Sequence, residues 1–178
     1  MPDASVSFAI RHAGAADARA LAALAARTFH DTFAADNDPV EMARHLASAY
    51  GDEQQRREIA DPAITTLLAV VDGTLAGYAQ LRTGQAADGV PPDAPIELWR
   101  FYVDRPWHGR GVAQALMQRV IDAARQAGAR TLWLGVWEHN LRAQSFYRTS
   151  GFTDVGAHVF MLGTEAQTDR LFARALVP

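Results

Sequence analysis

The stretch from Ile96 to Gly128 constrains the fold more than any other part of the chain, because it combines a strand, a glycine-bearing turn and a helix. Aromatic and branched residues fill positions 97 to 103, as a buried strand prefers. Gly109 and Gly111 follow, and apolar residues then recur at helical spacing up to Gly128. A helix that starts beside small residues leaves its first N–H groups open to an anion. We therefore predict an anion site, suited to phosphates, at this turn.

The remaining segments predict an α/β chain with a mixed central sheet and helices on both faces. The expected strands are 6–11, 64–71, 74–82, 97–103, 131–137 and 152–162. The expected helices are 17–33, 39–49, 52–59, 112–127 and 142–149, and a short helix is also expected over 165–176. A helical crossover predicts that strand 131–137 runs parallel to strand 97–103. The Gly- and Pro-rich segment 83–95 is expected to be a mobile loop within one domain that spans residues 1–178.

Composition excludes several classes of protein. A formal net charge of −3 disfavours a nucleic-acid binder, which needs a basic face. The absence of cysteine removes disulfides, thiolate metal sites and acyl-cysteine intermediates. The absence of lysine removes Schiff-base chemistry and the standard P-loop. No signal-peptide pattern and no run of 18 apolar residues is present, so we expect a cytoplasmic protein without a membrane partner.

Two common glycine motifs do not fit the turn at 108–113. The Walker A motif needs a lysine, and the dinucleotide fingerprint needs Gly or Ala where this chain has Gln114. The remaining pattern, His-Gly-Arg-Gly-Val-Ala, resembles the acyl-CoA pyrophosphate loop of the GNAT superfamily of N-acetyltransferases, Gln/Arg-x-x-Gly-x-Gly/Ala. His108 departs from that pattern, since the family usually has Gln or Arg there.

A second motif strengthens the resemblance. The family pattern Asn-x-x-Ala-x-x-Phe-Tyr-x-x-x-Gly-Phe is matched at every place by Asn140, Ala143, Phe146, Tyr147, Gly151 and Phe152. The resemblance implies a single-domain GNAT-like fold and transfer of an acetyl group from acetyl-CoA, without a metal, to a primary amine that attacks directly in a ternary complex. It also implies pantetheine along residues 101–103 and pyrophosphate on the glycine loop. The implied cofactor-binding residues are Phe101, Tyr102, Val103, His108, Gly109, Arg110, Gly111, Val112, Ala113, Asn140 and Tyr147.

Two residues are candidates for catalysis. In the family, the tyrosine that Tyr147 matches points at the cofactor sulfur. A leaving thiol has a pKa of about 8.5 and tyrosine one of about 10, so hydrogen-bond stabilisation of the thiolate is favoured over full proton transfer. Glu97 is a candidate base for the acceptor amine, provided that its pKa is raised or that water relays the proton. The structural alternatives are a core aromatic for Tyr147 and an exposed strand start for Glu97.

The acceptor is less constrained by the sequence. ELWRFYV at 97–103, WLGVWEHN at 133–140 and HVFMLGTEAQTD at 158–169 resemble bacterial spermidine/spermine N-acetyltransferases more weakly. Asp31, Asp36, Asp38 and Glu41 would then recognise a polyamine cation; otherwise they form a solvated acidic loop. A protein N-terminus or another small amine is the alternative acceptor, and a non-catalytic acyl-CoA sensor is the alternative function. A homodimer is left open.

Overall fold

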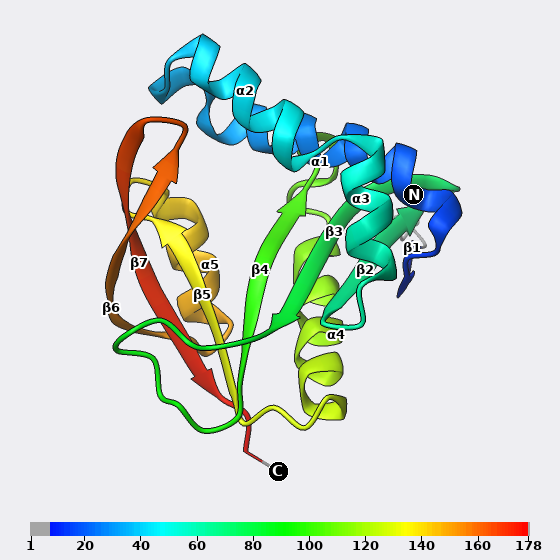
Figure 1. The fold of residues 1–178 in the computed structure, drawn as a ribbon. Coiled ribbons are helices and arrows are strands. Elements are labelled where there is room, and N and C mark those ends of the chain that lie inside the picture. The colour runs from blue at the N-terminus through cyan, green and yellow to red at the C-terminus, as the bar shows by residue number, and fades with distance from the viewer. Residues whose placement is uncertain (1–7, 178) are drawn as a thin grey trace.

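The computed structural model describes residues 8–177, which form one seven-stranded sheet with helices on both faces (Figure 1). The strands are β1 Phe8–His12, β2 Ile64–Val71, β3 Thr74–Thr83, β4 Pro95–Val103, β5 Thr131–Trp137, β6 Thr153–Leu162 and β7 Glu165–Ala175. The helices are α1 Ala18–Phe33, α2 Pro39–Ala49, α3 Asp52–Ala60, α4 Val112–Gln126 and α5 Leu141–Thr149. These bounds confirm the predicted α/β class and all five main helices. Val6 and Ser7, the start of the first predicted strand, lie outside the described residues.

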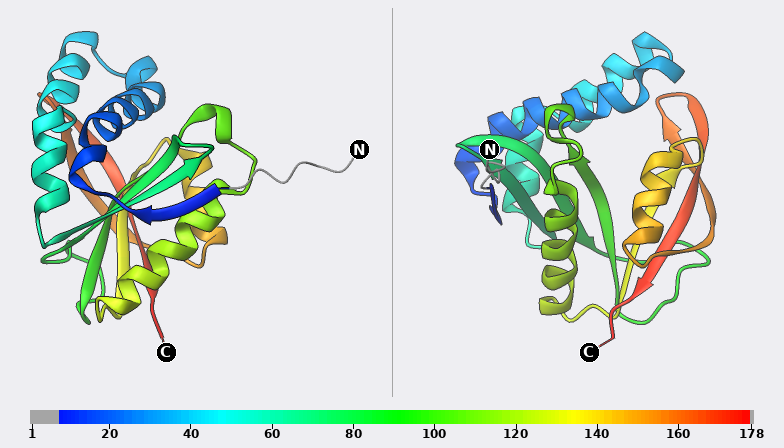
Figure 2. Two further views of the ribbon diagram at one scale, coloured as in Figure 1. Left: turned by 90° about the vertical axis from the view of Figure 1, so that its right-hand side faces the viewer. Right: turned by 180° about the vertical axis from the view of Figure 1, so that it is seen from behind.

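The helices divide between the two faces of the sheet, as Figure 2 shows. On one face, α4 buries Leu116 and Val120 against Leu132 and Leu134 of β5, in the same apolar cluster as Tyr147 of α5. On the other face, α1 and α2 pack with Leu68, Tyr78 and Leu162 in a second cluster. Because each face buries its own apolar set, the sheet is the common wall of two cores.

The strands run in the order β1-β2-β3-β4-β5-β7-β6, and β4–β5 is the parallel pair. This confirms the predicted parallel pairing. The pairing is short, because only Pro95, Ile96 and Glu97 are in register with β5. Beyond Glu97 the two strands diverge, as Figure 1 shows, so the later half of β4 pairs on its β3 side alone.

A β-bulge accompanies the divergence. The register between β3 and β4 moves from Leu81↔Leu98 to Gln80↔Arg100, so Trp99 is the extra residue. Leu98 and Phe101 belong to the α4 core, whereas Tyr102 packs against the opposite core. The bulge therefore shifts the alternation of side chains, and Trp99 and Arg100 both face the α1–α3 side.

The prediction of a helix over 165–176 is wrong, because this segment forms β7, inserted between β5 and β6. Its Leu171, Phe172 and Ala173 are buried in succession, as in a strand covered on both faces. Leu162 pairs with Glu165 across a two-residue turn, in which Gly163 has a φ of 61°. Gly163-Thr164 forms the turn of this hairpin, and the pairing of β7 with both neighbours outweighs the helix propensity of its alanines.

Residues 84–94 connect β3 and β4 without a helix or strand, as predicted. The connection is nevertheless anchored, because Val90 is buried in a cluster with Trp133 and Leu171. Ala86 and Ala87 pack against the same cluster. The loop thus covers the lower part of the sheet on the α1–α3 side.

Candidate active site

The divergence of β4 from β5 opens a cleft of about 820 Å³. Phe101, Val136 and Tyr147 line it from the α4–α5 side of the sheet, and Arg100 and Asp169 line it from the other side. The cleft therefore passes through the sheet where the strands separate. Two molecules can approach the same point from opposite faces, which is the arrangement that direct transfer between them needs.

The glycine turn lies beside this cleft, which His108 and Ala113 line. Gly109 and Gly111 have φ values of 73° and 82°, and a Cβ at either position would meet open space. Gly111 is the N-cap of α4, and no side chain among the described residues caps this helix end. The first turn of α4 is therefore free to receive an anion on its backbone N–H groups. This geometry fits the pyrophosphate of acetyl-CoA.

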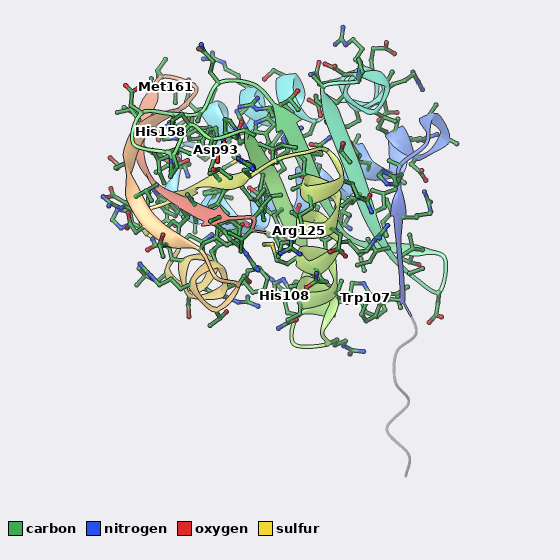
Figure 3. All side chains as sticks on the ribbon, turned by 90° about the horizontal axis from the view of Figure 1, so that it is seen from below. Asp93, Trp107, His108, Arg125, His158 and Met161 are labelled. Atoms are coloured by element: carbon green, nitrogen blue, oxygen red, sulfur yellow. The ribbon has the colours of Figure 1, made fainter. Side chains whose placement is uncertain are left out.

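His108 lies beside this turn and contacts the end of β4 (Figure 3). Its Nε2 is 2.7 Å from the carbonyl oxygen of Val103. The side chain at the position where the family has Gln or Arg thus connects the glycine loop to the strand. Arg110 reaches back over the ring of Trp107, 5.5 Å from its centroid, which leaves the backbone of the loop exposed.

The second half of β4 offers a free backbone edge to the cleft. Phe101, Tyr102 and Val103 pair with β3, and their other edge faces the space that β5 has left. An extended amide-bearing chain such as the pantetheine arm can add to such an edge as a further strand. The residues present therefore fit the cofactor that the sequence resemblance implies.

Helix α5 contributes Asn140 and Tyr147 from the opposite wall. Asn140 is the N-cap of α5, and its Oδ1 accepts a hydrogen bond from the Ala143 N–H at 3.2 Å. Tyr147 lines the cleft and is 8% exposed among the rings of Phe101, Phe146 and Phe152. Burial raises the pKa of its phenol above the ordinary value, so the hydroxyl stays a proton donor at neutral pH. Tyr147 is thus both a core aromatic and a cleft residue.

Glu97 lies in the cleft at the last residue that β4 pairs with β5, and its carboxylate is bound by the Arg82 guanidinium from β3. Arg82 also lies over the ring of Trp99, 4.2 Å from its centroid. The Glu97 side chain is only 15% exposed. Glu97 is therefore not an exposed residue at the start of a strand, and its carboxylate is already paired with an arginine.

The sequence did not reveal the polar cluster beneath Trp99. Arg100 forms a buried ion pair with Glu58 of α3, Nη1 to Oε2 at 2.6 Å, and the same Nη1 donates to Oε1 of Gln80 at 2.7 Å. The guanidinium also lies 3.7 Å from the Trp99 ring centroid and 4.8 Å from that of Tyr50. Burial raises the pKa of Tyr50 to about 12. No short-range sequence pattern links residues 58, 80 and 100, so folding alone brings them together.

The four acidic residues proposed for substrate recognition separate in the structure. Asp31 lines the cleft from α1. Asp38 caps α2, where its Oδ1 accepts from the Val40 N–H at 2.9 Å. Glu41 pairs with Arg44 at 3.0 Å and accepts a hydrogen bond from the Thr164 N–H in the β6–β7 turn. Asp36, Asp38 and Glu41 are not among the described residues that line the cleft.

A second acidic group that sequence patterns missed is Asp169 of β7. It lines the cleft, and its side chain is 14% exposed. Burial raises its pKa to about 6, against a smaller opposing effect of His158, whose Nε2 lies 3.8 Å from Asp169 Oδ2. The expectation of a helix over 165–176 hid this residue, because only a strand places it opposite β5 and β6 on one face.

The chain belongs to the acetyltransferase (GNAT) family, whose family model matches residues 19–152. It is 37% identical over 155 residues to an uncharacterized N-acetyltransferase of Lactobacillus delbrueckii subsp. lactis, covering 87% of this chain and 90% of the relative. An uncharacterized N-acetyltransferase of Mycobacterium tuberculosis is 36% identical over 161 residues, with 90% and 99% covered. The protein is therefore an acetyl-CoA-dependent N-acetyltransferase of the GNAT type.

A solved structure shares the fold. The PaiA N-acetyltransferase of Thermoplasma acidophilum, in complex with coenzyme A, superposes with a TM-score of 0.77 at 21% identity, covering 95% of this chain and 99% of that one. Within residues 8–177, no group of three or more His, Asp or Glu side chains is arranged to hold a metal ion. No helix in the same range is long and apolar enough to cross a bilayer.

Proposed function

We propose that this N-acetyltransferase acetylates the primary amine of a small molecule or of a peptide N-terminus by direct attack in a ternary complex. The observation that carries the proposal is the cleft through the sheet, which is lined by His108 and Ala113 beside the glycine loop and by Asp31 and Glu58 on the α1–α3 side. A through-cleft lets the cofactor and the acceptor enter separately and meet. The chain has no cysteine to carry the acetyl group in between.

Acetyl-CoA supplies the activated acetyl thioester when it is bound. The residues proposed to hold it are the backbone of Gly109–Ala113 for the pyrophosphate and the free edge of Phe101–Val103 for the pantetheine. The amide group of Asn140 is proposed to add a hydrogen bond to the same arm. Tyr147 is proposed to donate a hydrogen bond from its hydroxyl to the sulfur, and its raised pKa supports this role over full ionisation.

The charge of the cleft argues against a polyamine. Its lining includes four arginines, Arg82, Arg100, Arg105 and Arg142, against four carboxylates, Asp31, Glu58, Glu97 and Asp169. A site for a polycation is expected to present an excess of negative charge. Two of the carboxylates, Glu58 and Glu97, are already bound by arginines. The comparisons with known proteins do not support the polyamine resemblance either.

Thiol release from acetyl-CoA across a panel of amines tests the proposal. The panel contains amino acids, peptides with free N-termini, aminoglycosides, spermidine and spermine. We expect turnover with an amino acid or peptide and a lower kcat/KM for the polyamines. A reversed ranking would restore the polyamine hypothesis. Binding of acetyl-CoA by calorimetry without release of thiol for any amine would favour the non-catalytic acyl-CoA sensor.

A further inference from the structure

We propose that Asp169, with His158 beside it, takes the proton from the acceptor amine. The inference rests on the proposed function, and it assigns the base to β7 rather than to Glu97 of β4. It follows from a comparison of the four carboxylates that line the cleft. Asp31 is 38% exposed, whereas Glu97 and Glu58 are held by Arg82 and Arg100. Asp169 alone among these four is sheltered and has no arginine within ion-pair distance in the described chain.

The backbone is shaped around this pair. Asp169 lies opposite Trp137 on β5 and opposite His158 on β6, so the three side chains share one face of the sheet. Gly135 leaves the space between them, since a Cβ there would lie 3.2 Å from Asp169 Oδ2 and 3.1 Å from His158 Nε2. These distances are tighter than ordinary van der Waals contact. A glycine at position 135 thus lets the carboxylate and the imidazole lie against β5.

The groups that face Asp169 are mostly uncharged. The titratable side chain paired with it is His158 of β6, which is 40% exposed at the edge of the sheet (Figure 3). β5 presents Gly135 and Trp137, which do not titrate, and β4 presents the phenol of Tyr102. His45 of α2 also lines the cleft, and its ring packs against that of Phe160, with 6.2 Å between the ring centroids. The neighbouring Arg170 binds Asp154 at 2.7 Å instead.

Asp169 and the proposed hydrogen-bond donor Tyr147 line the same cleft. Tyr147 comes from the α5 side of the sheet and Asp169 from the α1–α3 side. This places a donor for the sulfur and an acceptor for the amine on opposite sides of the point where β4 and β5 separate.

The proton balance requires such an acceptor. An ammonium and a thioester give an amide, a thiol and one proton: the nitrogen loses two protons, the C–N bond forms as the C–S bond breaks, and the leaving thiolate takes up one proton. Asp169 takes the other and passes it to solvent, with the help of His158, which also lines the cleft and is 40% exposed. Its pKa of about 6 makes it a stronger base than an ordinary aspartate, with a pKa of about 3.9.

Asp169→Asn tests the inference, with Glu97→Gln as the matched control. With the best amine of the panel, D169N should lower kcat/KM about 100-fold or more at pH 7 and remove the limb of the pH profile near pH 6. E97Q should keep that limb, H158Q should show a smaller loss than D169N, and D169E should recover part of the rate. CoA affinity, measured by calorimetry, should be unchanged in all four variants.

A second measurement uses the ligand-free protein. In ¹³C NMR of the side-chain carboxyl groups, one aspartate should titrate near pH 6 in the wild type and in E97Q, and this signal should be missing in D169N. D169N with activity within threefold of the wild type, or an Asp169 carboxyl that titrates near pH 4, would overturn the inference. A wild type that acetylates no amine would defeat the proposed function itself, whereas an active wild type matched by D169N defeats the inference alone.

Discussion

Nη1 of Arg100 lies 2.6 Å from Oε2 of Glu58, so a buried ion pair ties the diverging half of β4 to helix α3. The two side chains are 8% and 4% exposed. Gln54 and Gln80 donate to the remaining lone pairs of Glu58, at 2.9 and 3.1 Å. Because its hydrogen bonds are satisfied, this cluster holds Trp99 and the bulge in place from below. It supports the shape of the cleft, which Glu58 and Arg100 themselves line.

Removal of one partner from this ion pair should be strongly destabilising. Glu58→Ala leaves the Arg100 guanidinium buried without a counter-charge, and we expect the free energy of unfolding to fall by about 3–5 kcal/mol. The control is Glu53→Ala, which breaks the solvent-exposed pair with Arg56 and should lower stability by less than about 1 kcal/mol. Urea denaturation of both variants measures the difference. Similar losses would mean that the buried pair has no special structural role.

The sequence predicted the elements whose signals are local. Such signals involve residues only a few positions apart, as in the Asp72-Gly73 hairpin turn, the Asn140 helix cap and the glycine turn before α4. β7 was missed because its alanines and arginines favour a helix when the segment is considered alone. It is a strand because it pairs with β5 on one side and β6 on the other. The same error concealed Asp169. The bulge at Trp99 and the Arg100–Glu58 pair depend on contacts between segments that are far apart in the sequence. No local sequence pattern therefore predicts them.

The conformation of the glycine turn gives a binding prediction. Gly111 has a φ of 82°, where a Cβ costs about 1–2 kcal/mol, so Gly111→Ala should lower stability and displace the first amides of α4. We expect at least a tenfold rise in the calorimetric Kd for CoA, about the loss of one charge-assisted hydrogen bond. Gly73→Ala is the matched control, since Gly73 has a φ of 78° and equally open surroundings in the β2–β3 turn. An equal rise in Kd for both variants would show that strain alone weakens binding.

Tyr147→Phe separates the hydroxyl from the ring. Phenylalanine keeps the packing against Phe101 and Phe152, so CoA affinity should be unchanged, whereas kcat should fall about 100-fold through loss of a hydrogen-bond donor. Because the pKa of Tyr147 is raised, its ionisation should cause no loss of wild-type kcat at pH 10. Tyr78→Phe is the control: this tyrosine is buried outside the cleft, and its hydroxyl has no hydrogen-bond partner in the described structure. Equal kcat values for Y147F and the wild type would remove Tyr147 from the chemistry.

Burial of Asp169 should also be visible in the pH dependence of stability. Its pKa is about 6 in the folded protein and about 4 in the unfolded chain. Between these values the folded state binds the proton more tightly, so the contribution of this group to the free energy of unfolding falls as the pH rises from 4 to 6. A shift of about two units corresponds to about 3 kcal/mol at most. Asparagine does not titrate, so the stability of D169N relative to the wild type should increase by up to that amount between pH 4 and pH 7.

Asp154 on β6 provides a control of opposite sign. The Arg170 guanidinium lowers the pKa of Asp154, so this carboxylate stabilises the folded state when ionised, and the effect is lost as the pH falls below its ordinary range. Relative to the wild type, D154N should therefore lose stability as the pH rises from 3 to 5, while D169N gains it between 4 and 7. Urea denaturation at half-unit pH steps resolves the two windows. A D169N difference that is flat with pH would mean that the carboxyl is hydrated in the cleft and titrates as an ordinary aspartate, which is not the environment of a base with a raised pKa.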